Sequence, residues 1–348
     1  MRENGLDAAF VPINVRKGLS ICPKENLTPL KSDMNKRFKP GYIPLFQNGE
    51  LPKRRDIGYQ ILESCTLCPR HCQVNRLKGE KGFCKSGSLA MISSYGPHFG
   101  EEQPLVGSHG SGTIFMTHCN LGCVFCQNYD ISHLGEGQEV SAKDLARMML
   151  ALQKGGCHNI NFVSPSHVVP QILDALIIAV ENGLNIPLVY NTGGYDQVKT
   201  IQLLDGVFDI FMPDFKFSDP EKGRTYAQAP DYFEAASAAI MEMHRQVGDL
   251  KLDENQIAFQ GLLVRHLVMP NRMAGTMKIM EWISQRISQN TYINIMDQYR
   301  PCGEAYQYPD INRRITHQEY QEAIEIAYKY GLTRLDNRRR LPLHWFDS

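Results

Sequence analysis

Short runs of β-branched and aromatic residues alternate with longer stretches of helical periodicity through most of the chain after residue 112. Six of these runs predict strands, because each is short, largely apolar and close to turn-forming residues. They are residues 113–118, 160–165, 186–192, 207–215, 261–270 and 291–299. The clearest helical stretch opens with a Ser-x-x-Asp capping pattern at Ser141 and stops at Gly155. Alternating strands and helices without a dinucleotide-binding glycine pattern predict an α/β fold with a parallel sheet, an incomplete (β/α)6 barrel in preference to an open doubly wound sheet.

The first 100 residues lack this alternation. Residues 1–57 mix Pro, Lys, Arg and Asn with little periodicity, which predicts an extended N-terminal arm laid over the rest of the protein. Residues 58–100 are rich in loops and cysteine, and their few apolar residues could not form a core alone. We therefore expect an arm at 1–57, a cysteine-rich metal-binding module at 58–100 and a partial barrel at 101–348.

Composition and charge exclude several classes of protein. The 348 residues are 43% hydrophobic and 21% charged, as in ordinary globular proteins. Lys plus Arg equals Asp plus Glu at 37 each, so the chain has no overall basic field to attract nucleic acid or an anionic membrane. No run approaches 18 apolar residues, and the N-terminus lacks the apolar segment of a secretory signal. These features predict a cytoplasmic protein that does not bind membranes, and they disfavour the binding of nucleic acid, although a local basic patch is compatible with them.

Cysteine carries the main chemical signal, since seven of the ten cysteines fall between residues 65 and 126. Clustered thiols in a reducing compartment mark metal or redox chemistry more often than disulfides. The segment THCNLGCVFCQN contains Cys119, Cys123 and Cys126. A structural zinc ion normally takes four ligands, and a redox CxxC pair would leave Cys119 unexplained. Three thiolates on a four-iron cube leave one iron open for an exchangeable ligand.

A second set of four cysteines precedes this segment. They are Cys65, Cys68, Cys72 and Cys84. Four thiolates complete a closed site, so the module is expected to hold a second metal, which fits structural zinc and an auxiliary iron–sulfur cluster equally well. The remaining cysteines are predicted to be small buried hydrophobic residues. These are Cys22, Cys157 and Cys302.

The spacing Cys119-x3-Cys123-x2-Cys126, with Phe125 before the last cysteine, resembles the signature of the radical S-adenosylmethionine (SAM) superfamily. In that family the open iron of a [4Fe-4S] cluster binds the amino and carboxylate groups of SAM. Reduction of the cluster, by a donor such as flavodoxin or ferredoxin, cleaves SAM to a 5'-deoxyadenosyl radical that abstracts hydrogen. Further segments, such as YNTGGYD and DIFMPDFKF, resemble the pyruvate formate-lyase activating enzyme-like (PflX-like) branch over roughly residues 59 to 335. The resemblance implies a radical SAM oxidoreductase.

Candidate SAM-binding residues follow the predicted strands, because ligands of α/β barrels lie at the carboxyl ends of the strands. They are Ser164, Ser166, Asn191, Asp214, Lys216 and His266. The family usually carries a Gly-Gly-Glu run where this chain has Ser164-Pro-Ser-His, whereas Asp214-x-Lys216 resembles the family's SAM-binding strand. His266 is expected to face the barrel interior together with Val264 and Val268.

Several other residues have two alternative roles each. His167 begins a helix and is either a ligand contact or a capping residue, and Gly193-Gly194 permits either a close ligand approach or a simple turn. Glu101 and Glu102 either lie near the cluster or are surface acids. Tyr299 or Arg300, after the last predicted strand, could touch the substrate.

Three functions compete at this level. The leading hypothesis is a radical SAM enzyme whose substrate is a backbone glycine of a partner protein, another protein or peptide residue, or a small metabolite. The alternative is a non-catalytic iron–sulfur electron-transfer or metal-binding protein, which the missing Gly-Gly-Glu run supports and the three-ligand spacing opposes. An RNA-modifying enzyme is disfavoured by the balanced charge and by the lack of an appended basic domain.

Overall fold

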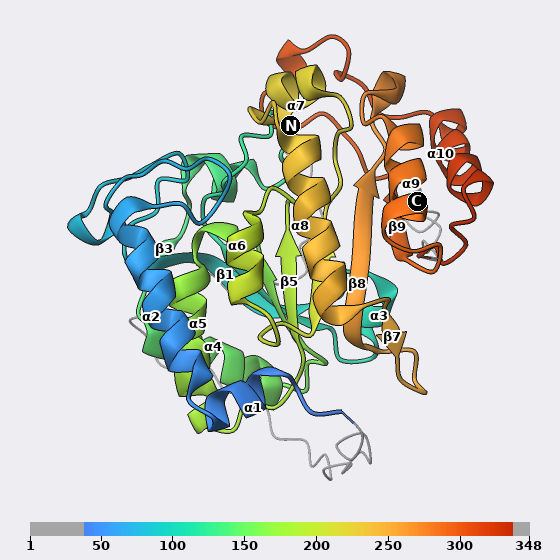
Figure 1. Ribbon diagram of the computed structural model, residues 1–348. Helices are drawn as coiled ribbons and strands as arrows, with labels where there is room; N and C mark the ends of the chain where they lie inside the picture. The colour runs from blue at the N-terminus through green and yellow to red at the C-terminus, as the bar shows by residue number, and fades with distance from the viewer. Residues whose placement is uncertain (1–37, 337–348) are drawn as a thin grey trace, which may run out of the picture.

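The computed structural model describes residues 38–336 (Figure 1). Most of the predicted arm, with Cys22, lies outside the described residues. The part inside is not extended, because it forms helices α1 (Tyr42–Gln47) and α2 (Glu50–Ile61). Only Leu51 and Gly58 of α2 are buried, so the helix shows little apolar periodicity and is stabilised by packing on the rest of the protein. A Cβ at Gly58 would lie 3.1 Å from Pro170, which shows how closely α2 packs there.

Six strands form a parallel sheet, and each overlaps one of the six predicted segments. They are β2 (Ser111–Met116), β4 (Ile160–Val163), β5 (Leu188–Thr192), β6 (Ile210–Pro213), β8 (Ala258–Leu267) and β9 (Tyr292–Met296). Each of these strands pairs in parallel with the next one in that order. A doubly wound sheet would reverse its strand order at a switch point. The α/β fold is therefore consistent with the predicted partial barrel.

Three further strands extend the sheet in antiparallel pairing. They are β1 (Ala90–His98), β3 (Gln138–Val140) and β7 (Lys251–Leu252). β1 pairs with both β2 and β3, and β7 pairs with β8. The sequence pattern did not predict them, since β1 contains Ser, Gly and Pro and the other two are very short.

Helices cover the outer face of the sheet (Figure 1). The longer ones are α4 (Ala142–Lys154), α5 (Val169–Glu181), α7 (Pro220–Ala227), α8 (Tyr232–Val247), α9 (Thr276–Arg286) and α10 (His317–Lys329). The short ones are α3 (Gln103–Val106), α6 (Val198–Leu203), the 3-10 turns Leu62–Ser64, Arg76–Lys78, Pro165–His167, Pro270–Arg272 and Ala305–Gln307, and the π-turn Asp130–Leu134. The predicted cap of α4 is confirmed, because the Ser141 hydroxyl accepts a hydrogen bond from the Asp144 N–H at 3.2 Å. No helix within residues 38–336 combines the length and the apolar character needed to span a membrane.

The inner face of the sheet is apolar near the start of the strands and polar near their ends. Val189, Ile210 and Leu263 form a small inner core, which Leu105 of α3 joins. Further along the strands the inward positions become polar, as at Asn191 and Arg265. The inner core therefore fills one end of the barrel, and the polar groups collect at the other end.

Candidate active site

The first part of the candidate site is the loop after β2, which carries Cys119, Cys123 and Cys126. The backbone N–H of Leu121 donates to the Cys119 Sγ at 3.4 Å. The Ser132 hydroxyl donates to the Cys126 Sγ at 3.1 Å. Hydrogen bonds to sulfur are a feature of iron–sulfur sites, where they tune the cluster. The three thiols could therefore hold a metal cluster at the carboxyl end of β2.

The C-terminal end of α7 holds this cysteine loop in place. The N–H of Gly122 donates to the carbonyl of Ala227 at 3.2 Å, and the N–H of Val124 donates to the carbonyl of Tyr226 at 3.0 Å. A Cβ on Gly122 would lie 2.8 Å from the side chain of Gln228. The loop and the end of α7 therefore pack closely against each other.

Burial makes the thiols of the loop weak acids. Desolvation, together with the neighbouring Cys126, raises the pKa of Cys119 to about 11 and that of Cys123 to about 12. The positive charge of Lys216 opposes the shift at both cysteines. Metal ligation requires thiolates, so binding of a cluster here would release protons.

The second part of the site is a group of inward-facing polar residues at the ends of β5, β6 and β8. The Arg265 guanidinium donates to Asp214 Oδ1 and to Asn191 Oδ1, each at 2.7 Å. The Lys216 ammonium lies 2.5 Å from Asp214 Oδ2. Asn191, Asp214 and Lys216 were predicted from the sequence, and the structure brings them together around Arg265, which was not predicted.

The charges in this group support one another. Burial alone would raise the pKa of Asp214, but the positive charges of Arg265 and Lys216 lower it below its usual value. Burial disfavours the Lys216 ammonium, yet the Asp214 carboxylate and the Cys123 sulfur together raise the pKa of Lys216. At neutral pH the group therefore contains two cations and one anion next to the cysteine loop.

Two glutamates lie under this group on the inner face of the sheet. Arg265 Nη1 lies 3.9 Å from a Glu101 carboxylate oxygen and 4.0 Å from one of Glu102. Glu102 Oε1 accepts a hydrogen bond from the Asn294 amide at 2.9 Å, whereas its Oε2 has no partner in the described part of the chain. Burial raises the pKa of Glu102. Both glutamates are buried, so the reading of these residues as surface acids is wrong.

The residues predicted after β4 lie only partly in the site. The side chain of Ser164 hydrogen-bonds to Cys119, which tends to lower the pKa of that thiol. Ser166 is turned away, because its hydroxyl lies 3.1 Å from the hydroxyl of Thr192. His167 Nε2 lies 3.0 Å from the carbonyl of Thr117, two residues before the cysteine loop, and burial lowers the pKa of His167 to about 3. Ser166 and His167 therefore support the loops around the site.

The predicted orientation of His266 is wrong. Its Nδ1 lies 2.7 Å from the Phe215 carbonyl, and its Nε2 lies 2.9 Å from the Thr276 hydroxyl of α9, so the ring is buried between the sheet and that helix. Successive residues of a strand face opposite sides, and the inward position belongs to the preceding Arg265. Val264 belongs to the outer core and lies on the same face of β8 as His266. The alternation was therefore correct, but it was assigned to the wrong face.

Neither predicted candidate after β9 is directed into this group. The Tyr299 side chain is buried and donates its hydroxyl hydrogen to the Ile311 carbonyl at 2.7 Å. Its ring packs against Phe125 at a centroid distance of 6.0 Å. Arg300 is exposed. Tyr299 thus supports the cysteine loop from behind.

Gly194 is required by the packing of the site. Its φ is +83°, and a Cβ there would lie 2.1 Å from the carbonyl oxygen of Asp214. We expect Gly194→Ala to destabilise the protein by more than about 2 kcal/mol, because it adds a steric clash to the cost of a left-handed alanine. Gly183→Ala is the matched control, since Gly183 has φ +90° and no atom within 4 Å of the added Cβ. Urea unfolding of both variants measures the difference, and equal losses of stability would contradict the close packing.

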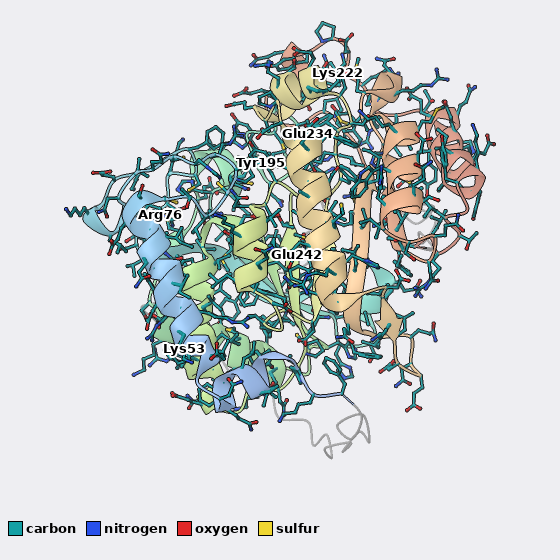
Figure 2. All side chains as sticks on the ribbon, viewed as in Figure 1. Lys53, Arg76, Tyr195, Lys222, Glu234 and Glu242 are labelled. Atoms are coloured by element: carbon teal, nitrogen blue, oxygen red, sulfur yellow. The ribbon has the colours of Figure 1, made fainter. Side chains whose placement is uncertain are left out.

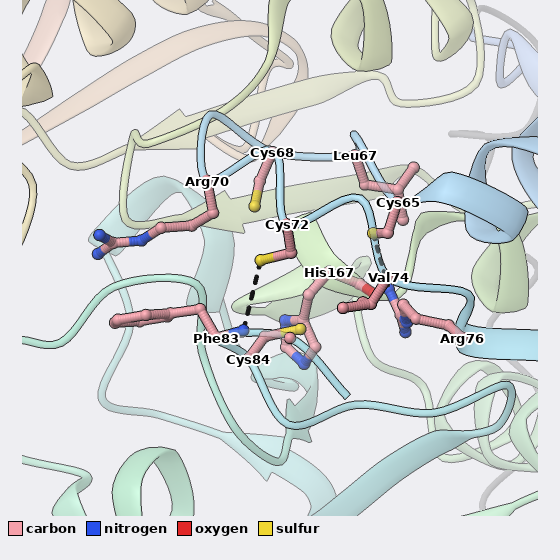
Figure 3. Close-up of a pocket in the computed structure, with 11 residues that line it drawn as sticks. Cys65, Leu67, Cys68, Arg70, Cys72, Val74, Arg76, Phe83, Cys84 and His167 are labelled. Atoms are coloured by element: carbon pink, nitrogen blue, oxygen red, sulfur yellow. Dashed lines mark hydrogen bonds between the residues drawn. The ribbon is translucent and has the colours of Figure 1, made fainter. Parts of the chain in front are cut away.

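The four cysteines of the N-terminal module line one pocket (Figure 3). They are Cys65, Cys68, Cys72 and Cys84. Arg70 and Arg76 also line this pocket, and Figure 2 places Arg76 on the side of the molecule away from α9 and α10. Within residues 38–336, no three His, Cys, Asp or Glu side chains are arranged to hold one metal ion.

Comparison with known proteins adds to this geometry. The family model described as the Radical SAM superfamily matches residues 113–257. The Uncharacterized protein MJ0674 of Methanocaldococcus jannaschii is 36% identical over 285 residues, which cover 80% of this chain and 78% of that protein. The crystal structure of HydG, a maturase of the [FeFe]-hydrogenase, aligns with a TM-score of 0.45 and 11% identity over 64% of this chain. The chain spans 49% of the length of that structure.

Proposed function

Because the chain belongs to the radical SAM superfamily, we propose that its three-cysteine loop is the site at which SAM is cleaved. The cofactors of the family are a [4Fe-4S] cluster and SAM, which together supply a 5'-deoxyadenosyl radical for hydrogen abstraction. The protein is accordingly a radical SAM enzyme, and the alternative of a non-catalytic electron-transfer protein is set aside. The proposed cluster ligands are Cys119, Cys123 and Cys126.

The observation that carries this assignment is the position of the cysteine loop beside a buried polar group at the strand ends. Two of the three thiols accept hydrogen bonds from Leu121 and Ser132, and such bonds tune iron–sulfur clusters. The electrostatic influence of Lys216 on Cys123 supports a short distance between the loop and the polar group. The donor set fits a cluster with one open iron.

We infer that the polar group binds SAM. Asp214 is an anion that can accept hydrogen bonds from an amino group or a ribose hydroxyl, and Lys216 is a cation suited to a carboxylate. The Asn191 amide and the Ser164 hydroxyl supply neutral hydrogen bonds on the same side. Arg265 positions Asp214 and Asn191, because it donates to both. These residues orient SAM toward the cysteine loop.

We further propose a protein substrate, with glycyl-radical activation as in the pyruvate formate-lyase activating enzyme-like branch. Leu134 and Tyr306 support this proposal, since they are 65% and 63% exposed and lie on segments next to the cysteine loop. These segments are joined by a hydrogen bond of 2.9 Å from the Tyr129 hydroxyl to Glu304. Where exposed apolar side chains form a contiguous patch, they mark surfaces that bind another protein. An anionic reductant such as flavodoxin or ferredoxin is expected to dock near Lys81 and Lys85, whose charges lower the pKa of His118 beside the loop, after the larger effect of burial.

Isotope transfer tests the substrate proposal. The reconstituted enzyme is incubated with dithionite, SAM and a candidate glycyl-radical partner that carries deuterium only on its glycine α-carbons. Deuterium is expected in 5'-deoxyadenosine, because the radical would remove hydrogen from one of these carbons. The matched control is the same partner with the target glycine replaced by alanine, which should transfer no label. Transfer from labelled small metabolites, with none from any glycyl partner, would contradict the proposal of a protein substrate.

A further inference from the structure

We propose that the N-terminal module holds a second, fully ligated [4Fe-4S] cluster. Its four ligands are Cys65, Cys68, Cys72 and Cys84. Three of them lie within eight residues, as do the three cysteines of the loop after β2, with the two gaps in reversed order. Cys84 supplies a fourth thiol, so this cluster would have no open iron and would not bind SAM.

The backbone of the module adopts unusual conformations beside two of the four cysteines. His71 and Gln73, which flank Cys72, have φ of +44° and +56°, and Lys85, which follows Cys84, has φ of +53°. Non-glycine residues rarely adopt such angles, and they cluster where the surrounding structure holds a ligand or an active site. The backbone is therefore strained next to Cys72 and Cys84, where it directs the thiols into one pocket.

Close packing within the module points to the same pocket. A Cβ at Gly82 would lie 2.7 Å from the Cys72 Sγ, so only glycine lets the segment before Cys84 approach Cys72. The N–H of Phe83 donates to the Cys72 Sγ at 3.4 Å. Backbone N–H groups that donate to sulfur stabilise thiolate ligands, as in the loop after β2.

A buried arginine lies beside the pocket without a carboxylate partner among the described residues. Arg76 is 1% exposed, and no carboxylate within residues 38–336 forms an ion pair with it. Its guanidinium donates to the carbonyls of Gly87 and His167 and lies 3.9 Å from the Cys65 Sγ. Buried charges in proteins are normally paired. Metal-bound thiolate at Cys65 would supply the missing negative charge.

The likeness of the module to the loop after β2 favours a cluster over a single zinc ion. Four thiols line the pocket, and their number alone fits a closed zinc site and a closed four-iron cube equally well. The first three repeat the two short gaps of the loop after β2 in reverse, and that loop belongs to a family that holds a four-iron cube there. A polynuclear core therefore fits the module.

The module is also joined to the loop after β2. Arg70 donates to the Asn120 carbonyl at 2.9 Å and to the Ala227 carbonyl at 3.3 Å, so it contacts both the loop and the segment that holds it. The His167 residue that accepts from Arg76 also contacts Thr117. The module that would hold the second cluster is thus hydrogen-bonded directly to the loop that would hold the first.

Iron analysis of two variants, reconstituted anaerobically, tests the inference. The first variant replaces Cys119, Cys123 and Cys126 by alanine and leaves the module intact. It is expected to retain about four irons and four sulfides per chain, against about eight in the wild type, with a reduced-state EPR signal that SAM does not alter. The second variant, Cys65→Ala with Cys72→Ala, is expected to keep about four irons whose signal responds to SAM. Cys157→Ala, which removes a buried cysteine outside both sets, should keep about eight.

The first variant decides the outcome, because its module is unchanged whether or not the second variant folds. One zinc ion, about two irons, or no metal in the first variant would each overturn the second cluster. Loss of the SAM response in the wild type would instead overturn the proposed function, so the two failures are distinguishable.

Discussion

Cys123→Ala is expected to lower the formation of 5'-deoxyadenosine by more than about 100-fold in the presence of dithionite and SAM. Loss of an outer residue that merely supports a metal ligand typically costs 10–100-fold, so loss of a ligand itself should cost more. With only Cys119 and Cys126 left, the cube would lack a thiolate at a second iron. The measurement is anaerobic single-turnover assay of 5'-deoxyadenosine by chromatography, with iron content determined on the same sample.

The control for this prediction is Cys157→Ala. Cys157 is 3% exposed and belongs to the outer core, so the substitution removes a buried thiol without touching the cysteine loop. Its activity should stay within about twofold of the wild type, since small changes in the core mainly affect stability. If Cys123→Ala retained wild-type activity, the assignment of the cluster to this loop would have to be abandoned.

Asp214→Asn is expected to lower the free energy of unfolding by about 3–5 kcal/mol. The substitution leaves the guanidinium of Arg265 and the ammonium of Lys216 buried without the carboxylate that both contact. The side chains of these two cations are only 16% and 15% exposed, so water cannot replace the lost partner. Removal of one partner from a buried ion pair typically costs this amount. Urea unfolding of the metal-free protein measures the effect without a contribution from SAM or a cluster.

The matched control is Asp205→Asn, which removes the same charge from a surface ion pair. Asp205 and Arg245 lie 2.7 Å apart, but their side chains are 45% and 56% exposed. Exposed pairs contribute about 0–1 kcal/mol, so this variant should unfold almost as the wild type does. Equal losses of unfolding free energy in the two variants would contradict the prediction, because Asp214 would then contribute no more than a surface charge does.

The parallel strands could be predicted because each is a short apolar run, as expected of a strand that is covered on both faces of the sheet. The antiparallel strand β1 could not, since it contains Ser, Gly and Pro and pairs with β2 and β3 from elsewhere in the chain. The helical form of Glu50–Ile61 was missed for a similar reason. This helix packs closely against Pro170 of α5, a contact that the local sequence does not reveal.

In the site, the spacing of residues along the chain predicted the cysteine set, whereas the orientation of side chains on a strand was not predicted correctly. Cys119, Cys123 and Cys126 are proposed as cluster ligands from their gaps along the chain. Arg265 and His266 are neighbours, and a choice of the wrong face for β8 exchanged a charged group of the inner face for a buried histidine. The burial of Glu102 depends on its long-range contacts with Arg265 and Asn294. No pattern within the local sequence could have indicated it.

The contact of Leu105 with the inner core has a consequence for the order of events during turnover. Because apolar side chains fill the barrel at that end, ligands have to pass through the opposite end, where the cysteine loop lies. A large partner docked over that opening would enclose whatever had bound before it. We therefore expect sequential kinetics, in which the nucleotide binds first and the spent fragments leave only after the partner has dissociated.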